Sequence, residues 1–480
     1  MTTGRRGTAI VLGIDLATSA ARVTAVDLDS GADLGFVGSP LAMPTQGDRG
    51  ESRQRADHHL IVRQLLRRTA DLLGDRASDV IALSVTGTSG TLIGLDAAGV
   101  PVTDAVLYDD TSGTELAARL TTLGMTYGAG SVLVRMGLLA LEPAVSRIVS
   151  TADLVLTDLA GHPVASDTSH FLKVGIDPAT RSWPLESLAA VGVGEALMPE
   201  LTAPGTALGV VTPDLAGEWG LGSGVALVAG MTDGCTAQIS CGAVEIGDTV
   251  GVLGTTLVLK GVAAERIDLP DGSVYSHQAP DGSWWPGAAS NSGAGVLAST
   301  TSHADLAALD AAAAAHGPAE IVRYPLAGVG ERFPVADTGF VGWILGEPRD
   351  RVEAHRAVLE GVAFVERLGL ERLQSLGLRR GTHRLAGGGA RSDVWNRIRA
   401  TVLGSPVQVP HAAGSGRGAA LLAAATVQQR SLGHVFRAWD SGSVVVEPDD
   451  RETARLDENY QRFLARLDPA GERAARLPVP

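Results

Sequence analysis

The sequence places one carboxylate at the turn between an apolar strand and a helix. Asp233 stands in the segment VALVAGMTDGCTAQIS, after an apolar run and before a helical pattern. A carboxylate at such a strand end can accept a proton from a bound hydroxyl group, so Asp233 is a candidate general base. Aspartate is also a preferred helix N-cap. The two roles are compatible, because an N-cap at a strand end facing a cleft would point its carboxylate at a bound hydroxyl.

A second set of polar residues lies in the turn GIDLATSAAR near the start of the chain. Glycine lets the backbone approach a phosphate, hydroxyl groups donate to phosphate oxygens, and a carboxylate can hold Mg²⁺ directly or through water. An ordinary hairpin turn that contains aspartate is the alternative. The candidate ligands in this turn are Gly13, Asp15, Thr18, Ser19 and Arg22, with Asp15 as the metal ligand.

The second half of the chain repeats this pattern in the segment VGVLGTTLVLK. Its turn consists of Gly254, Thr255 and Thr256, whose amides and hydroxyl groups suit the β- and γ-phosphates of a nucleotide. A triphosphate held in a cleft needs donors from both sides, so the two turns together are more informative than either alone.

The segment AGGGARSDVW places three glycines between a strand and a helix. A flat adenine and its ribose can lie against the bare backbone of Gly387, Gly388 and Gly389. Trp395 follows on the helix, where a ligand role and a place in the core are both open.

Hydroxyl and carboxylate residues also gather in two loops of the first half. Thr88 and Ser89 in GTSGT, with Asp109 and Asp110 in LYDDTSG, can supply the hydrogen bonds that a polyol needs. Ser and Thr are common in turns without any ligand. The lone His170 is a weaker candidate.

Alternating strand and helix patterns predict the elements that position these residues. Apolar alternation over 8–29 predicts a hairpin, and helical spacing predicts helices over 57–74, 351–376, 415–428 and 447–467. The class is therefore α/β. With 480 residues the chain exceeds one ordinary core, and two domains are expected with the site in the cleft between them.

Composition excludes several other classes of protein. The formal net charge of -14 and the lack of a basic stripe argue against nucleic-acid binding. No apolar run is long enough for a membrane span and no cleavable signal is recognised, so we expect a cytoplasmic protein. The two cysteines are too few for a disulfide framework.

These motifs, in this order, resemble the FGGY carbohydrate kinases, from Ala9 to about Leu467. The segment GWILGEPRDRVEAHRAVLEGVAFVER is similar to a second signature of that family. The resemblance implies a ribonuclease-H-like fold of the actin and hexokinase type, with ATP and Mg²⁺ as cofactors. It also implies that Asp233 is the base, that Asp15 lies at the phosphates and Mg²⁺, and that LAGGGARSDVW, which includes Ser392 and Trp395, binds the adenosine.

Within the family, the segments GTSGT, SVYSH and YPLAGVGERFPVAD look most similar to the D-ribulose kinase branch. The implied reaction is phosphorylation of a terminal hydroxyl of a pentulose such as D-ribulose, with D-xylulose or another ketose or polyol as the alternative. Thr86, Asp110 and His170 depart from residues that are frequent in relatives, which affects the choice of sugar.

The resemblance also implies a division of the chain into domains. We expect a sugar-binding domain over 1–243, a nucleotide-binding domain over 244–430 and a helical extension over 431–480. A non-catalytic, actin-like ATP-binding regulator or assembly protein is the alternative of another class. The expected partner is a small sugar, and a homodimer is left open.

Overall fold

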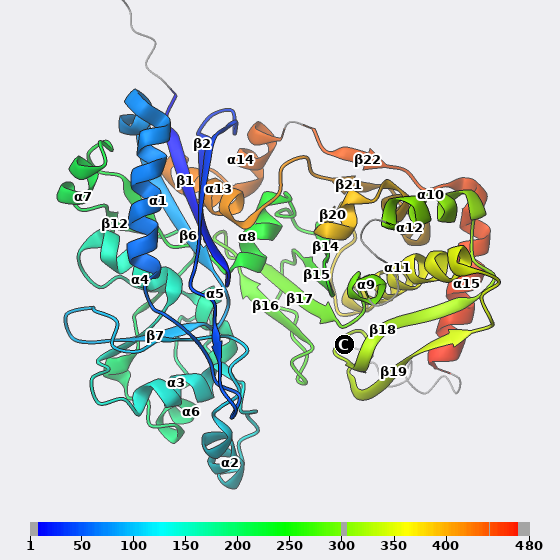
Figure 1. Ribbon diagram of the computed structural model, residues 1–480, viewed down its shortest axis with the longest axis horizontal. Coiled ribbons are helices and arrows are strands. Elements are labelled where there is room, and N and C mark those ends of the chain that lie inside the picture. Colours follow the sequence, from blue (N-terminus) through cyan, green and yellow to red (C-terminus); the bar gives the residue numbers. More distant parts are fainter. Residues whose placement is uncertain (1–7, 299–304, 441, 469–480) are drawn as a thin grey trace, which may run out of the picture. The chain divides into compact units, whose positions relative to one another are not determined.

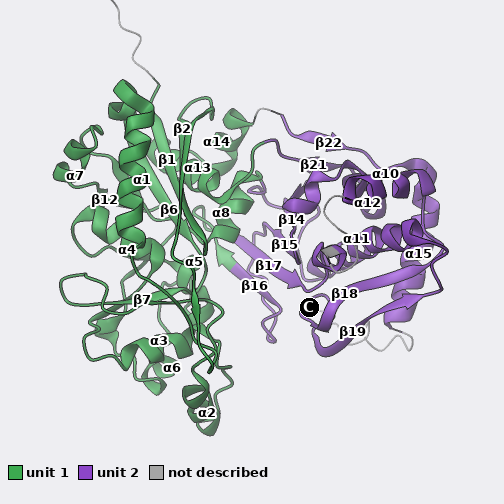
Figure 2. Cartoon of the chain, viewed as in Figure 1, with its two compact units in different colours: residues 1–242, 277–282, 412–440 green, residues 243–276, 283–411, 441–480 purple. Residues whose placement is uncertain are grey.

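The computed structural model describes residues 8–298, 305–440 and 442–468. These form two compact units (Figure 2). Unit 1 contains residues 1–242, 277–282 and 412–440, and unit 2 contains residues 243–276, 283–411 and 441–480. The first seven residues and the last twelve residues of the expected C-terminal extension lie outside the described part.

The main sheet of unit 1 has six strands in the order β12-β13-β6-β1-β2-β3 (Figure 1). The strands β1, β2 and β3 form an antiparallel meander, which includes the hairpin predicted over 8–29. β6 pairs parallel to β1, and β13 pairs parallel to β6. The strand bounds are β1 Ile10–Leu16, β2 Ala20–Asp27, β3 Asp33–Pro40, β6 Val80–Gly87, β12 Ala207–Val210 and β13 Ala226–Val228.

Helices cover both faces of this sheet because the side chains of β1 alternate between two apolar environments. Ile10, Leu12 and Ile14 pack in a core with residues of α1 His58–Leu73 and α4 Thr151–Ala160. The opposite face of β1 meets α13 Ser415–Gln428, which has the predicted bounds.

Glycine permits the unusually close approach of α13 to the sheet. A Cβ atom on Gly13 would lie 1.7 Å from the carbonyl oxygen of Gly416, and one on Gly418 would lie 1.8 Å from the carbonyl oxygen of Thr236. Gly13 therefore accommodates a helix rather than a phosphate, which corrects its interpretation from the sequence. This packing also explains why residues 412–440 lie in unit 1, although the sequence placed them in the second domain and the extension.

A smaller sheet of unit 1 has the order β4-β5-β8-β7-β9. Residues 80–95 form two strands, β6 and β7, which belong to different sheets. The turn at 88–91 therefore links the two sheets of unit 1. The remaining elements of unit 1 are β4 Thr45–Gln46, β5 Ser52–Gln54, β7 Leu92–Leu95, β8 Ala105–Val106, β9 Arg147–Ser150, β10 Ser166–Asp167, β11 Leu201–Thr202, α2 Thr114–Thr122, α3 Val132–Ala140, α5 Thr168–Phe171, α6 Leu185–Ala190, α7 Pro213–Glu218, α8 Asp233–Ser240, α14 Leu432–Trp439, η1 Gly74–Asp79, η2 Leu172–Val174 and η3 Glu195–Leu197.

The main sheet of unit 2 has the order β16-β17-β15-β14-β20-β21-β22. β14 and β15 form an antiparallel hairpin, and β20 pairs parallel to β14. The elements of this unit are β14 Thr249–Leu253, β15 Leu257–Gly261, β16 Val274–Gln278, β17 Trp284–Ser290, β18 Val322–Glu331, β19 Asp337–Leu345, β20 His383–Ala386, β21 Val407–Val409, β22 Val444–Val446, α9 Gly295–Ala298, α10 Leu306–His316, α11 Arg351–Ser375, α12 Asp393–Leu403, α15 Asp450–Leu467 and η4 Gly388–Arg391.

Long helices build the core of unit 2. The apolar face of α11, predicted over 351–376, packs with residues of α12, α15 and β18. Phe364, Tyr460 and Phe463 form an aromatic cluster with Tyr324 in this core. Within the described residues, no helix has the length and hydropathy of a membrane span.

Candidate functional site

In unit 1, three neighbouring parallel strands end at the same edge of the sheet. β1 carries Asp15 near its end, β6 ends at Gly87 before Thr88 and Ser89, and β13 leads to Asp233. Asp15 is in register with Thr86, and Gly87 forms a parallel bridge with Thr232. Ligands of α/β sheets bind outside the carboxyl ends of the strands, so this edge is the candidate site of unit 1.

Asp15 lies in a partly buried, charged environment. Its Oδ2 accepts a hydrogen bond from Arg22 Nη1 at 3.0 Å, and 13% of its side chain is exposed. Burial raises the pKa of the Asp15 carboxyl above its usual value, Arg22 opposes that rise, and the charge of Asp233 adds to it. The two predicted carboxylates therefore lie close enough to repel each other.

Asp233 is the first residue of α8, and its side chain is half-buried. Thr232 is the N-cap residue, so Asp233 is not the cap that the alternative interpretation expects. The Oδ1 atom of Asp233 accepts a hydrogen bond from the amide of Gly234 at 2.6 Å.

The loop at residues 88–91 offers an unpartnered hydroxyl group. Ser89 Oγ is buried and has no hydrogen-bond partner among the described residues. Thr88 Oγ1 lies 2.7 Å from Thr91 Oγ1, so these two hydroxyl groups satisfy each other. A buried polar atom without a partner costs about 1–3 kcal/mol, so Ser89 is the residue of this loop that a bound hydroxyl would satisfy.

Thr86 has a structural role behind this loop. Its Oγ1 donates to the carbonyl of Met231 at 2.7 Å and lies 2.9 Å from Thr236 Oγ1. The threonine at this departure from the family pattern thus ties the end of β6 to the segment around Asp233.

The Asp109–Asp110 segment divides into an exposed and a buried residue. Asp110 is fully buried, pairs with Arg53 and accepts hydrogen bonds from the amide of Ser52 and the hydroxyl of Ser112. Its carboxylate is satisfied by the protein, so the structure corrects the expectation that Asp110 lines a sugar site. Asp109 remains exposed.

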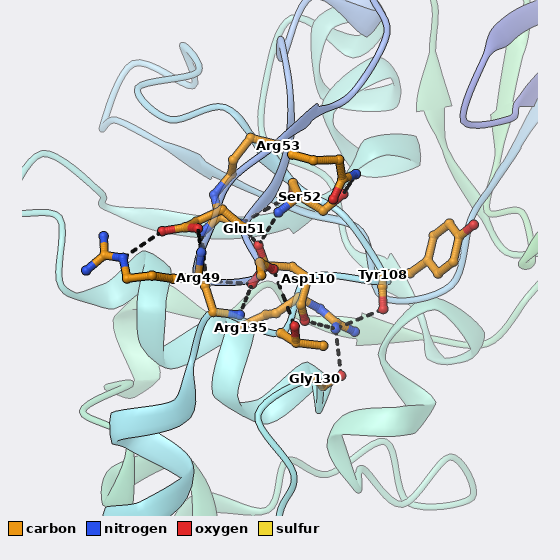
Figure 3. A network of polar contacts seen from close by, with 12 residues as sticks. Arg49, Glu51, Ser52, Arg53, Tyr108, Asp110, Gly130 and Arg135 are labelled. Carbon is orange, nitrogen blue, oxygen red and sulfur yellow. Dashed lines mark hydrogen bonds and ion pairs between the residues drawn. The ribbon is translucent and has the colours of Figure 1, made fainter. Parts of the chain in front are cut away.

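Arg135 connects the loops around this segment (Figure 3). Its guanidinium donates to the carbonyls of Gly90, Tyr108 and Gly130 at 2.7–3.0 Å. Burial lowers the pKa of Arg135 to about 10, and the charge of Asp109 opposes that change. The contacts of Arg53 with Asp110 and Ser112 could not be predicted from the sequence, because they join positions more than fifty residues apart.

In unit 2, the two predicted glycine turns are neighbours. The turn at Gly254–Thr256 follows β14 and the turn at Gly387–Gly389 follows β20, at the ends of adjacent parallel strands. Gly387 has a φ of 83°, and a Cβ atom on it would lie 2.5 Å from the carbonyl oxygen of Leu253. Thr255 and Gly388 are exposed. The structure thus presents the backbone of both turns and the hydroxyl group of Thr255 at one edge of the sheet.

Trp395 and Ser392 serve the fold of unit 2. Trp395 is 3% exposed, packs in the core and donates its indole N–H to the carbonyl of Leu359 at 3.0 Å. Ser392 caps α12 by accepting from the amide of Trp395, and donates to Asp310 at 2.6 Å. These bonds place Trp395 in the core, which corrects its expected ligand role, and give Ser392 a capping role.

The candidate Mg²⁺ ligand set is small. The described residues contain no group of three or more His, Cys, Asp or Glu side chains that could hold a metal ion. Mg²⁺ in kinases is often bound by only one or two carboxylates together with water and substrate phosphates, so Asp15 fits such a role.

Comparisons with known proteins find similarity to carbohydrate kinases. Residues 251–427 match the C-terminal domain of the FGGY family of carbohydrate kinases. The xylulose kinase of Staphylococcus epidermidis is 26% identical over 95% of this chain and 96% of its own length. The second half of the chain therefore carries the C-terminal domain of FGGY carbohydrate kinases.

Two further relatives extend the comparison. The xylulose kinase of Escherichia coli is 31% identical over a segment that covers 53% of each protein. The crystal structure of a xyloylose kinase from Brucella ovis superposes with a TM-score of 0.85 at 25% identity, over 97% of this chain and 100% of that one. The predicted two-domain sugar-kinase fold of the actin and hexokinase type is confirmed.

Proposed function

We propose that this chain is an FGGY carbohydrate kinase that transfers the γ-phosphoryl group of ATP to a terminal hydroxyl group of a pentulose. The observation that supports this most is the grouping of Asp15, Ser89 and Asp233 at the ends of three parallel strands of unit 1. This edge supplies a carboxylate for the phosphates and Mg²⁺, a hydroxyl group for the sugar and a base.

In the proposed mechanism, Asp233 accepts the proton of the sugar hydroxyl as its oxygen attacks the γ-phosphorus. The new bond joins that oxygen to phosphorus, and the bond from phosphorus to the β-γ bridging oxygen breaks, with ADP leaving. Ser89 orients the sugar through a hydrogen bond.

We propose that unit 2 holds the nucleotide. The turn at Gly254–Thr256 would contact the phosphates, and the turn at Gly387–Gly389 would lie against the adenosine. Mg²⁺, held by Asp15 directly or through water, would neutralise phosphate charge. Arg22 holds Asp15 in place through the bond at 3.0 Å.

The identity of the pentulose rests on two different observations. The segments GTSGT, SVYSH and YPLAGVGERFPVAD look most similar to the D-ribulose kinase branch, whereas the relatives that match most of the chain are named xylulose kinases. Both sugars are ketopentoses with a terminal hydroxyl group, so the proposal is made for this class. A cytoplasmic location and a homodimer stay predictions.

A coupled assay of ADP release tests the proposal. Purified protein with Mg-ATP is assayed against D-ribulose, L-ribulose, D-xylulose, ribitol, xylitol, erythritol and glycerol, and mass spectrometry and NMR locate the phosphate on the product. We expect turnover on one pentulose that is lost in Asp233→Asn. ATP binding without sugar-stimulated turnover would contradict the proposal and favour a regulator.

A further inference from the structure

A buried ion pair lies behind the strand ends that carry the candidate base. His170 in α5 is 0% exposed, and its Nδ1 lies 2.5 Å from Oδ2 of Asp167. From the sequence, His170 is only a weak candidate for the sugar site, and Asp167 is not a candidate. The one local signal is an Asx N-cap, in which Asp167 precedes the short helix 168–171.

Hydrogen bonds connect this pair to the backbone next to Asp233. The other carboxylate oxygen of Asp167 accepts from the amide and the hydroxyl group of Ser169. Ser169 Oγ in turn accepts from the amide of Thr232 at 2.9 Å. Because Thr232 directly precedes Asp233, displacement of Asp167 or Ser169 would move the start of α8.

Surrounding carboxylates favour a charged imidazole. Burial opposes protonation of His170, but Asp167, Asp153 in α4 and Asp233 in α8 outweigh it and raise its pKa above the usual value. Asp153 is itself fully buried and bonded to Ser150 and Ser166. A cation beside two buried carboxylates reduces the cost of burying their charge.

The second nitrogen of His170 faces the end of β6. A Cβ atom on Gly87 would lie 3.7 Å from His170 Nε2 and 2.9 Å from Thr151 Oγ1. Neither atom has a hydrogen-bond partner among the described residues. The imidazole therefore lies directly behind Gly87, which bridges Thr232 and begins the loop of Ser89.

We propose that His170, held by Asp167, is a positioning residue that fixes the start of the helix that carries Asp233. The proposal rests on the proposed function, because it takes Asp233 as the base. His170 acts through the bonds that run from Asp167 by Ser169 to Thr232. Without the imidazole these bonds are no longer held in place, so Asp233 is positioned less accurately for proton transfer.

The test is the steady-state kinetics of full-length variants with the pentulose and ATP. In His170→Asn we expect kcat to fall about 3- to 30-fold while the KM for ATP stays unchanged. Asp167→Asn keeps the helix cap and should lower kcat in the same way. The double variant should lose little more than either single one.

His58 provides a matched control. It is a buried histidine of α1 in the same unit, 3% exposed, and burial lowers its pKa to about 4. His58→Asn should leave kcat near its wild-type value. Thermal unfolding checks each variant, and His170→Gln replaces His170→Asn if the latter does not fold.

Two outcomes would overturn the inference in different ways. If wild type turns over the pentulose and Asp233→Asn does not, but the folded His170 and Asp167 variants keep the kcat of wild type, only the role of His170 is wrong. If wild type shows no turnover that depends on Asp233, the proposed function and this inference fail together.

Discussion

The candidate sites of the two units use different parts of the polypeptide. The edge in unit 1 presents side chains, with Asp15 and Asp233 interacting electrostatically and Ser89 Oγ left without a partner. The edge in unit 2 presents two turns, 254–256 and 387–389, made largely of glycine backbone. Side chains supply proton transfer and selectivity, whereas bare backbone suits a phosphate or a flat base. Substitutions in unit 1 should therefore affect the sugar and the chemistry, and those in unit 2 the nucleotide.

The largest expected effect is that of Asp233→Asn. Because the amide cannot accept the proton, kcat should fall by about two to four orders of magnitude while the KM for ATP stays near its wild-type value. Steady-state kinetics measures both constants. Asp71→Asn, at an exposed carboxylate of α1 in the same unit, is the control and should retain most activity. Near-normal turnover of Asp233→Asn would remove it as the base.

A smaller effect is expected from Gly388→Val in unit 2. A Cβ atom at this exposed glycine meets no atom closer than 3.8 Å, so the fold should tolerate it. The bulk added to the turn should raise the KM for ATP by about tenfold with little change in the KM for the sugar. Gly339→Val, at an exposed glycine of β19, is the matched control. An unchanged KM for ATP would separate this turn from the nucleotide.

Ser89→Ala should have a smaller effect than Gly388→Val, and the effect should fall on the KM for the sugar instead of the KM for ATP. Loss of one hydrogen bond of about 0.5–1.5 kcal/mol should raise the KM for the sugar by several-fold and leave that for ATP unchanged. Thr88→Val is the comparison, because Thr88 Oγ1 already bonds to Thr91. Equal changes in both KM values would show that Ser89 acts through the fold.

The smallest kinetic effect is expected from Trp395→Phe. The change removes the bond from the indole N–H to Leu359 and leaves a smaller ring in the core. Stability should fall by about 1–3 kcal/mol while the KM for ATP is unchanged. Denaturant unfolding and kinetics together check this. A large rise in the KM for ATP at unchanged stability would restore the ligand role.

The sequence predicted the elements better than the contacts of single side chains. The bounds of α13 and the strand before Asp233 follow from local periodicity, and the glycine turns follow from local composition. The packing of Gly13 against Gly416 and the pairing of Asp110 with Arg53 depend on residues far apart in the chain. Periodicity carries no information on such pairs. For this reason the sequence predicts a phosphate contact for Gly13 and a sugar contact for Asp110.

His170 is a residue whose role the sequence underestimates for the same reason. A lone histidine in the sequence is usually solvated, and nothing local shows that Asp167, Asp153 and the start of α8 surround it. The fold also assigns residues 412–440 to unit 1, because α13 packs on β1 through glycines whose partners lie about four hundred residues away.

The central claim is that the edge of unit 1 serves the sugar and the chemistry while the edge of unit 2 holds the nucleotide. It is tested most directly by calorimetric titration of Asp233→Asn and Gly388→Val with ATP in the presence of Mg²⁺. The account predicts that Asp233→Asn binds ATP with an affinity close to that of wild type, while Gly388→Val binds it about tenfold more weakly. Loss of ATP binding in Asp233→Asn with wild-type binding in Gly388→Val would contradict it.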